Sequence, residues 1–482
     1  MKRRILSLLL VLAMAMSLVA CGGNGGQQGG GQNNGGNAAV GNFEVPEGGY
    51  DGSEVTIKFY HTMGANLREV LENYIVEFNK LYPNIHIEHS QVGNYDDVRD
   101  QIVQEISIDG QPNIAYCYPD HVALYNLAEA TVTLDSLIAS KVEVTRADGT
   151  TEVLGLTDEQ IADFIEGYYN EGKQFGDNLM YTLPLSKSTE VLYYNKTFFD
   201  ANGIKVPTTW DELEKVCEQI KAIDPESIPL GYDSESNWFI NMCEQLGTPY
   251  TSAKDGEHYL FDDAKNHEFV KRFNGWYQKG YVTTQELYGA YTSGLFVNQD
   301  PTSAKSYMSI GSSAGATHQR PAMVDGAYPF EVGIAPIPQA DASNPKVISQ
   351  GPSLCIFGKE NDQEVIASWL FVKYLTTTVE FQAEFGMASG YVPVLKSVGE
   401  HPVYAKYLEG ANGGSNIAAL STKVCLEQAD AYYTSPAFNG SSAAREQVGT
   451  LLMKCLTMTG ADLDAQIKAA FEDAVAECEY EE

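Results

Sequence analysis

From about residue 55 onward, the chain alternates between two hydrophobic periods. Residues 55–60 (VTIKFY) alternate apolar and polar side chains and are rich in β-branched residues, which is typical of a strand. Apolar residues then recur at helical spacing until Pro83 ends the helix; they are Leu67, Val70, Leu71, Tyr74, Ile75, Phe78 and Leu81. Residues 85–88, 98–108 and 113–117 predict a strand, a helix and a strand in turn. Such alternation predicts an α/β fold with mostly parallel sheets and helices on both faces.

The second half of the chain continues the pattern. Residues 190–194 predict a strand. The sequence TWDE (residues 209–212) has the spacing of a capping box, with Thr209 as N-cap and Glu212 reaching back. The remaining predicted elements are helices over 269–277 and 364–375, strands over 306–310 and 332–335, and helical structure from about residue 443 to the end.

The first twenty residues have the pattern of a signal peptide rather than of a folded element. A basic start over residues 2–4 precedes an apolar run over residues 5–18, which is shorter than the roughly 20 residues that cross a bilayer. The run ends in LVAC (residues 18–21), which resembles a bacterial lipobox. The resemblance implies that residues 1–20 are a lipoprotein signal peptide and that Cys21 is the lipidation site. The alternative is an ordinary secretory signal followed by a cysteine by chance.

Residues 21–52 are expected to be a flexible tether. Residues 22–36 are almost entirely Gly, Gln and Asn, which cannot bury apolar surface. No later segment is apolar enough to span a bilayer, so the lipid on Cys21 is the expected attachment to the cell membrane.

The charge balance is strongly acidic. The chain has 31 basic and 64 acidic side chains, a formal charge of −33, and loss of the signal peptide leaves 28 − 64 = −36. Such a charge opposes binding to nucleic acid or to anionic membrane surfaces and favours a soluble, self-repelling protein, which we expect to be a monomer. A solvated acidic surface is the default interpretation.

The cysteines do not form a metal-binding pattern. With Cys21 lipidated, seven remain, so at least one is unpaired; they are Cys117, Cys217, Cys243, Cys355, Cys425, Cys455 and Cys478. The chain has no CxxC pair and no HExxH spacing. We therefore expect buried core cysteines, no metal site and no cofactor.

Several blocks, in this order, resemble the family 1 extracellular solute-binding proteins of ABC importers. The most specific is YTLPLSKSTEVLYYNKTFFDANGIKVPTTWDELEKVCEQI (residues 181–220), with its LYYNK and PTTWDEL blocks. Residues 59–88 (FYHTMGANLREVLENYIVEFNKLYPNIHIE) match the opening strand, helix and strand of the family, and VGIAPIP, QGPSLCIF and SGYVPV match three further blocks. The resemblance extends over about residues 54–475.

The resemblance implies a two-lobed periplasmic-binding-protein fold of type II, with a hinge of crossing strands between the lobes. We place lobe one at residues 53–165 and 330–390, and lobe two at residues 166–329 and 391–482. A small solute is expected to bind in the cleft between the lobes, and closure around it prepares delivery to the transmembrane permease subunits of an ABC importer.

Within the family, FYHTM, VGNYDDV, SSAGA, QGPSL and SGYVPV resemble the branch that binds glycerol-3-phosphate and glycerophosphodiesters. The resemblance implies ligand-binding roles for Tyr95, Asp120, Ser188, Trp238, Ser313, Gly351, Tyr391 and Arg445. Arg445 and Ser313 stand where the branch contacts phosphate. The acid that holds the glycerol hydroxyls follows directly on the tyrosine aligned with Tyr118; this chain has Pro119 there, so that role falls to Asp120 one residue later.

The chemistry of these residues suits a phosphate. The Arg445 guanidinium offers a planar fork of donors, and backbone N–H groups at Ser312 and Ser313, after Gly311, could cradle an anion. Each residue also has an ordinary structural interpretation, as a surface arginine, a capped loop or a packing tyrosine.

A mono- or oligosaccharide is the alternative ligand. Sugars stack on aromatic faces and bond to carboxylates and amides. The aromatic candidates are Trp238, Tyr60, Tyr118 and Tyr391, and the hydroxyl partners are Asp120, Glu190 and Asn237.

Two other classes of function compete with solute binding. Residues 311–315 (GSSAG) satisfy the GxSxG pattern of a serine hydrolase, with Ser313 as nucleophile and Asp325 and His401 following in order. Nothing else resembles a hydrolase, and no carboxylate pair stands out for a glycosidase. An adhesive or structural lipoprotein is a third class, which would lack a ligand-linked hinge motion. We predict a binding protein without enzymatic activity.

Overall fold

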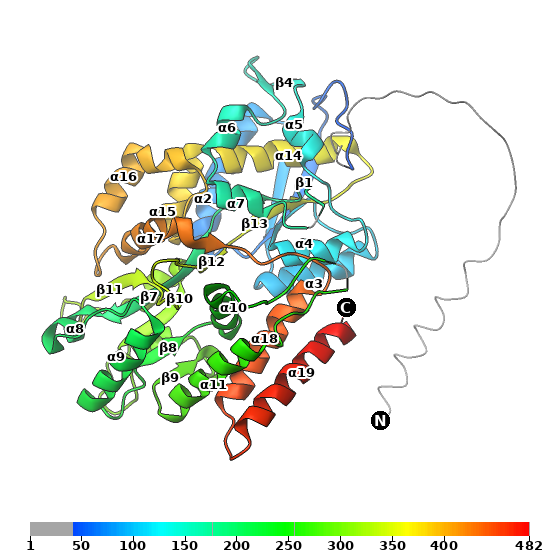
Figure 1. Cartoon of the computed structure of the whole chain (residues 1–482). Coiled ribbons are helices and arrows are strands. Elements are labelled where there is room, and N and C mark those ends of the chain that lie inside the picture. The colour runs from blue at the N-terminus through cyan, green and yellow to red at the C-terminus, as the bar shows by residue number, and fades with distance from the viewer. Residues whose placement is uncertain (1–41, 176, 255, 482) are drawn as a thin grey trace, which may run out of the picture. The chain divides into compact units, whose positions relative to one another are not determined.

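The computed structural model describes residues 42–175, 177–254 and 256–481 (Figure 1). The expected signal peptide, the lipidation site Cys21 and most of the expected tether lie outside these residues. Within the described ranges, no helix combines the length and apolar character needed to cross a membrane.

Sheet one contains five strands in the order β2 (Ile85–Gln91), β1 (Val55–His61), β3 (Ile114–Cys117), β13 (Ser353–Ile356) and β6 (Leu183–Pro184). The first three strands are parallel, with Val55 opposite Ile85 and Phe59 opposite Ile114. Strands β13 and β6 add antiparallel pairs. The predicted strands at 55–60, 85–88 and 113–117 are therefore confirmed within about three residues.

Sheet two is a seven-stranded sheet. Its order is β14 (Tyr432–Tyr433), β12 (Val347–Gln350), β7 (Ser188–Asn195), β10 (Met308–Ser312), β8 (Leu230–Tyr232) and β9 (Val282–Thr284), and β11 (Val332–Pro336) also pairs with β7. Strand β7 runs antiparallel to β10, β11 and β12, whereas β10, β8 and β9 are parallel. Both sheets are thus mixed rather than mostly parallel, because the strands that pass between the sheets run against their neighbours.

Helices cover both sheets. Helices α2 (Ala65–Leu81), α3 (Tyr95–Ile106) and α14 (Asp362–Thr377) belong with sheet one. Helices α9 (Trp210–Ile223), α10 (Glu235–Leu246), α11 (Ala264–Gln278), α18 (Ser441–Leu456) and α19 (Leu463–Glu481) lie around sheet two (Figure 1). The other elements are α4 (Pro119–Asn126), α5 (Asp135–Ala139), β4 (Glu143–Thr145), β5 (Thr151–Val153), α6 (Asp158–Asp163), α7 (Glu166–Glu171), α8 (Lys196–Asn202), α12 (Gln285–Tyr288), α13 (Ser293–Phe296), η1 (Ser313–Gln319), α15 (Val379–Ser389), η2 (Lys396–Glu400), α16 (Pro402–Glu409), α17 (Ile417–Glu427) and η3 (Ala429–Ala431).

Two helix starts show how local sequence sets these boundaries. At α9, Thr209 Oγ1 accepts from the Glu212 backbone N–H at 3.2 Å, as predicted. The Glu212 carboxylate accepts from the backbone N–H of Thr208 at 2.8 Å, so the reciprocal contact falls one residue before the expected one. At α3 the predicted start was late, because Asn94 and Asp97 form a full capping box that begins the helix at Tyr95.

The boundaries between the two layers differ from the expected ones. Strands β11 and β12, placed in lobe one from the sequence, pair with β7 in sheet two. Strand β6 and helix α7, placed in lobe two, contribute to the layer of sheet one. The reason is that the chain passes from sheet one to sheet two at residues 185–187 and returns at residues 351–352. We call these two stretches the crossing segments.

The last part of the expected tether, residues 42–52, is packed against the fold rather than flexible. Phe43 is buried in the first hydrophobic core. The Asn42 side chain donates to Thr131 O at 2.9 Å and accepts from Thr133 N–H at 2.9 Å. Residues 42–52 are therefore part of the layer of sheet one.

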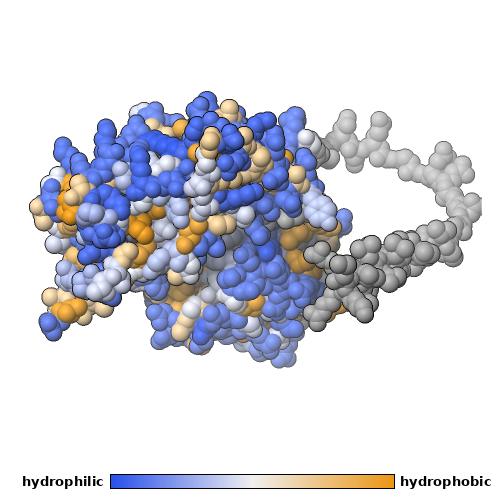
Figure 2. Space-filling view, turned by 90° about the horizontal axis from the view of Figure 1, so that it is seen from below, coloured by the Kyte–Doolittle hydropathy of each residue, from blue (hydrophilic) through white to orange (hydrophobic). Residues whose placement is uncertain are grey.

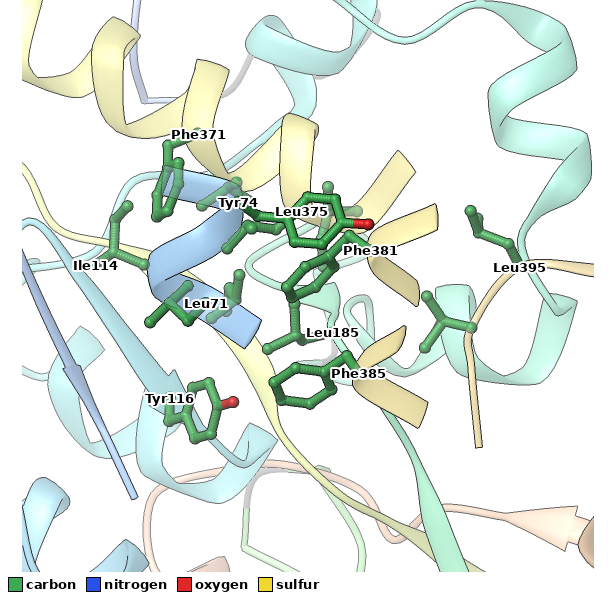
Figure 3. Packing of buried hydrophobic residues seen from close by; sticks show 14 of the residues in the cluster. Leu71, Tyr74, Ile114, Tyr116, Leu185, Phe371, Leu375, Phe381, Phe385 and Leu395 are labelled. Atoms are coloured by element: carbon green, nitrogen blue, oxygen red, sulfur yellow. The ribbon is translucent and has the colours of Figure 1, made fainter. Parts of the chain in front are cut away.

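The hydrophobic cores do not divide by layer, because the first core also contains Val191 and Tyr193 of β7 and Val332 of β11, which belong to sheet two. Figure 3 shows part of the first, where Leu185 of a crossing segment lies beside Phe381 and Phe385 of α15. The second core contains Trp210, Trp238 and Trp276. The face drawn in Figure 2 is mostly hydrophilic with scattered hydrophobic residues.

Candidate functional site

A polar cleft lies between the layers of sheet one and sheet two. It consists of two hollows that share Tyr118, Asp120 and Arg445 in their walls. The inner cavity has a volume of about 70 Å³ and the outer cavity of about 770 Å³. The outer volume is within the usual range for sites that bind small molecules.

The wall on the side of sheet one is built at the carboxyl ends of parallel strands. Strand β3 is fully buried and ends at Cys117, after which Tyr118 caps α4 and Asp120 lies in its first turn. Strand β2 leads in the same direction to Tyr95 at the start of α3. Open α/β sheets commonly bind ligands at this edge.

Three tyrosines form a stack along this wall. The rings of Tyr95 and Tyr118 lie 4.4 Å apart at 22°, and the Tyr95 ring lies 6.2 Å from that of Tyr116 at 14°. Burial raises the pKa of Tyr95 and of Tyr118, and the neighbouring Tyr391 phenol contributes to both shifts. The phenols therefore remain neutral at physiological pH.

The opposite wall carries Arg445 on α18, whose side-chain partner is neutral. The Arg445 guanidinium donates through Nη2 to Asn237 Oδ1. Asn237 Nδ2 in turn donates to Glu190 Oε1 at 3.0 Å and to Gln350 Oε1 at 2.8 Å. Because an amide does not neutralise it, the cation retains its charge for an anionic group in the cleft.

Glu190 ends this chain of hydrogen bonds inside sheet two. Its carboxylate also accepts from Tyr232 Oη at 2.5 Å and from Asn241 Nδ2 at 2.7 Å. Burial raises the pKa of Glu190 to about 7, against the lowering effect of these donors. Glu190 and Asn237 were expected as partners of sugar hydroxyls, but both are buried and bonded to one another, so they orient Arg445 instead.

The outer cavity is otherwise acidic. Arg99 lines it, but this guanidinium is paired with Asp96 at 3.1 Å and with Asp100 at 2.8 Å. The carboxylates in its wall are Asp96, Asp120, Glu235, Glu286 and Glu446. A solute that bears hydroxyl donors therefore finds several carboxylate acceptors in this wall.

The structure brings three of the predicted site residues together. Tyr95, Asp120 and Arg445 line the outer cavity, and Asp120 and Arg445 also line the inner one. Tyr391 adjoins the tyrosine stack, as its effect on the pKa of Tyr95 shows.

Two further predicted residues lie in the hinge. Ser188 pairs with Gln350 in the antiparallel ladder of β7 and β12. Gly351 lies in the second crossing segment with a φ of 110°. A Cβ atom at Gly351 would lie 2.6 Å from Ser186 O, so glycine is needed for the close approach of the two crossing segments.

Two predicted positions are corrected. Trp238 is fully buried in the second core, where its ring stacks on Tyr232 at 4.8 Å and 9°, so it does not face the cleft. Ser313 is also fully buried, and its Oγ accepts from Thr189 N–H at 3.1 Å. This hydroxyl holds the start of η1 against β7, which leaves it unavailable as a phosphate ligand or as a hydrolase nucleophile.

The inner cavity also contains residues that the sequence did not indicate. Glu171, Tyr250, Thr251 and Ser349 line it, and no motif distinguishes them. The seven cysteines within the described residues are buried thiols without disulfides. In the same part of the chain, no group of three or more His, Cys, Asp or Glu side chains is arranged to hold a metal ion.

Curated relatives match most of the chain. The sn-glycerol-3-phosphate-binding periplasmic protein UgpB of Shigella flexneri is 24% identical over 352 residues, which cover 71% of this chain and 75% of the relative. The protein of the same name from Escherichia coli K12 matches with the same identity and coverage.

Solved structures share the fold. UgpB from Mycobacterium tuberculosis in complex with glycerophosphocholine superposes with a TM-score of 0.68 at 16% identity, covering 89% of this chain and 99% of that chain. The cyclic α-maltosyl-1,6-maltose binding protein from Arthrobacter globiformis gives 0.66 at 19% identity, covering 89% and 100%. These similarities confirm the predicted type II periplasmic-binding-protein fold.

A family model described as bacterial extracellular solute-binding protein matches residues 73–411. This range includes both crossing segments and the Tyr95–Tyr118–Asp120 wall of the cleft. The chain therefore belongs to the bacterial extracellular solute-binding proteins.

Proposed function

We propose that this chain captures a small polar solute in the cleft and delivers it to the permease of an ABC importer, while a lipid on Cys21 keeps it at the outer face of the membrane. The observation that supports this proposal is the shared wall of the two hollows. Tyr118 and Asp120 come from the layer of sheet one and Arg445 from that of sheet two, so a bound solute contacts both. The family membership supports delivery to a transporter.

Closure follows from this arrangement. A solute held by both walls gains more contacts when the layers approach, and so binds the closed state more tightly than the open one. A ligand shifts such an equilibrium only by its difference in affinity between the two states. The closed form is then the one that the permease recognises.

The glycerophosphate class is one candidate for the solute. Arg445 offers a phosphate a guanidinium whose hydrogen-bond partner, Asn237, is neutral, and the relatives named UgpB are described as binding sn-glycerol-3-phosphate or as holding glycerophosphocholine. Asp120, in the opposite wall, is placed to accept hydrogen bonds from hydroxyl groups.

A neutral sugar is the second candidate, and specific observations favour it as well. Tyr95 and Tyr118 place aromatic rings in the wall of the outer cavity, and five carboxylates line the same cavity. The structural neighbour from Arthrobacter globiformis is described as binding cyclic α-maltosyl-1,6-maltose.

Binding without chemical turnover is part of the proposal. The serine of the GxSxG pattern is buried and bonded, so it cannot attack a substrate. Incubation of the protein with ester substrates should release no product, and measurable turnover would contradict a pure binding function.

Arg445 distinguishes the two ligand classes. The purified chain and its Arg445→Gln variant are titrated calorimetrically with sn-glycerol-3-phosphate and with maltose, and thermal shifts are recorded in parallel. If the ligand is a phosphate, the wild type should bind sn-glycerol-3-phosphate and Arg445→Gln should not. If the ligand is a neutral sugar, Arg445→Gln should bind maltose as the wild type does. Arg272→Gln is the control, because Arg272 pairs with Asp211 and Glu214 and lines neither hollow of the cleft. If neither probe, nor a wider panel of sugars and glycerophosphodiesters, binds the wild-type chain, the proposed function is wrong.

A further inference from the structure

One buried ion pair connects the inner cavity to the hinge. Glu171, the last residue of α7, is 2% exposed and lines the inner cavity. Its carboxylate pairs with the ammonium of Lys187, which is fully buried within the first crossing segment.

Lys187 bonds to both crossing segments at once. Besides Glu171, its ammonium donates to Gly351 O at 3.1 Å and to Ser353 Oγ at 2.9 Å, in and beside the second crossing segment. Its backbone exchanges two hydrogen bonds with Val392, of 2.9 and 2.6 Å. An ammonium group has three donors, so all of those on Lys187 are used.

Glu171, in contrast, has acceptor capacity to spare. A carboxylate offers about four lone-pair sites, and Lys187 occupies one of them. Two other groups of the same cavity also await a partner. Ser349 Oγ, on a residue that is 7% exposed, and Thr251 Oγ1 are buried, and among the described residues neither has a hydrogen-bond partner. Buried polar atoms are nearly always satisfied, so a molecule that enters the cavity, whether solute or water, is placed to supply these bonds.

We infer that Glu171 is a specificity-determining residue of the inner cavity: it accepts a hydrogen bond from a hydroxyl or ammonium group of the solute and couples that contact, through Lys187, to both crossing segments. The inference rests on the proposed function. A phosphate oxygen at this position would place a second negative charge beside the Glu171 carboxylate in a buried site, which is unfavourable. The hydroxyl-bearing or cationic end of the solute therefore points to Glu171, and an anionic end, where present, points to Arg445.

The test compares Glu171→Gln with a matched control. The control is Glu152→Gln, because Glu152 pairs with the nearly buried Lys373 at 3.0 Å and lines neither hollow of the cleft. Both variants and the wild-type full chain are titrated by calorimetry with sn-glycerol-3-phosphate and with maltose. Small-angle scattering records the radius of gyration with and without each probe.

We expect Glu171→Gln to weaken binding of whichever probe the wild type binds by at least tenfold and to reduce the ligand-induced compaction, while Glu152→Gln binds and closes like the wild type. Unchanged or tighter binding by Glu171→Gln would overturn the inference and leave the proposed function intact. Absence of binding by the wild type would remove the proposed function and the inference with it.

A second variant distinguishes a loss of folding from a loss of ligand binding. If Glu171→Gln does not fold, the double variant Glu171→Gln/Lys187→Met removes the unpaired buried ammonium. It should fold, as judged by a cooperative thermal transition, and still show the loss of affinity and of compaction. A double variant that binds like the wild type would contradict the inference.

Discussion

Arg99 on α3 donates a hydrogen bond from Nη1 to Ser442 Oγ on α18, at 3.2 Å, and so joins the layer of sheet one directly to the helix that carries Arg445. The two residues are 343 positions apart in the chain. Both line the outer cavity, at the place where the two walls approach one another. This bond is therefore made only when the cleft is closed to this extent.

Loss of this bond should favour the open form. Ser442→Ala removes the acceptor without removing the charge of Arg99, which stays paired with Asp96 and Asp100. A hydrogen bond of this kind contributes about 0.5–1.5 kcal/mol, which corresponds to roughly a 2- to 10-fold shift of the equilibrium. The radius of gyration of the ligand-free protein should increase in small-angle scattering, and ligand affinity should fall by a similar factor. The substitution Ser343→Ala, on an exposed loop, is the control, and equal scattering curves for Ser442→Ala and wild type would contradict the prediction.

Gly351→Ala should destabilise the fold. Its φ of 110° is unfavourable for any residue with a Cβ, and that atom would lie 2.6 Å from Ser186 O and 2.8 Å from Lys187 Cα. Backbone strain of this type costs about 1–3 kcal/mol, and the clash adds to it. Gly203→Ala is the matched control, because its φ is 63° and a Cβ there meets nothing within 4 Å. Urea unfolding should show a clearly larger loss of unfolding free energy for Gly351→Ala; equal losses would mean that the close approach is unimportant.

Glu190 should make stability depend on pH. Its pKa is about 7 in the folded protein, raised from 4.5 by burial. The folded state therefore holds this proton more tightly than the unfolded state does, so the contribution of Glu190 to stability is largest below pH 4.5 and is lost as pH rises towards 7. Glu190→Gln does not titrate. Chemical unfolding at pH values from 4.5 to 8 should show that the wild type loses stability relative to Glu190→Gln as pH rises, with little further change above 8. A constant difference would contradict the shifted pKa.

The proposed lipid anchor at Cys21 leads to a direct chemical prediction. Cells that express the chain in the presence of labelled palmitate should yield a labelled protein, and Cys21→Ser should abolish the label. The variant should also leave the membrane fraction, because the charge of the chain does not support binding to anionic lipid surfaces. Substitution of Cys117, which is fully buried, is the control and should not alter labelling. A labelled Cys21→Ser protein would exclude this anchor.

Local patterns in the sequence were sufficient for the longer strands and helices that were predicted, but they did not indicate many of the shorter elements. The alternation in residues 55–60 and the helical period from Leu67 to Leu81 depend on which side chains face a core, and the structure confirms both. The N-cap at Thr209 was also predictable, because a cap involves residues only three positions apart. The family resemblance then led to Arg445, Tyr95 and Asp120, which line one cleft.

What could not be predicted depends on contacts between distant residues. The sequence made Trp238 a candidate cleft residue, because it does not show that the rings of Tyr232 and Phe273 pack against the indole. The predicted lobe boundaries were wrong because β11 and β12, which lie within the range 330–390 expected for lobe one, pair with β7 in sheet two. Glu171 carries no local signal at all, since its importance comes from Lys187 and from the cavity wall.

The burial of the tryptophans has a practical consequence for spectroscopy. Trp210, Trp238, Trp276 and Trp369 are the four tryptophans of the chain, each is at most 2% exposed, and neither hollow of the cleft, as far as the described residues line it, contains one. Their emission should accordingly be blue-shifted and almost indifferent to the arrival of a solute. An optical reporter would have to be introduced, and Tyr250→Trp in the inner cavity is the natural position for it.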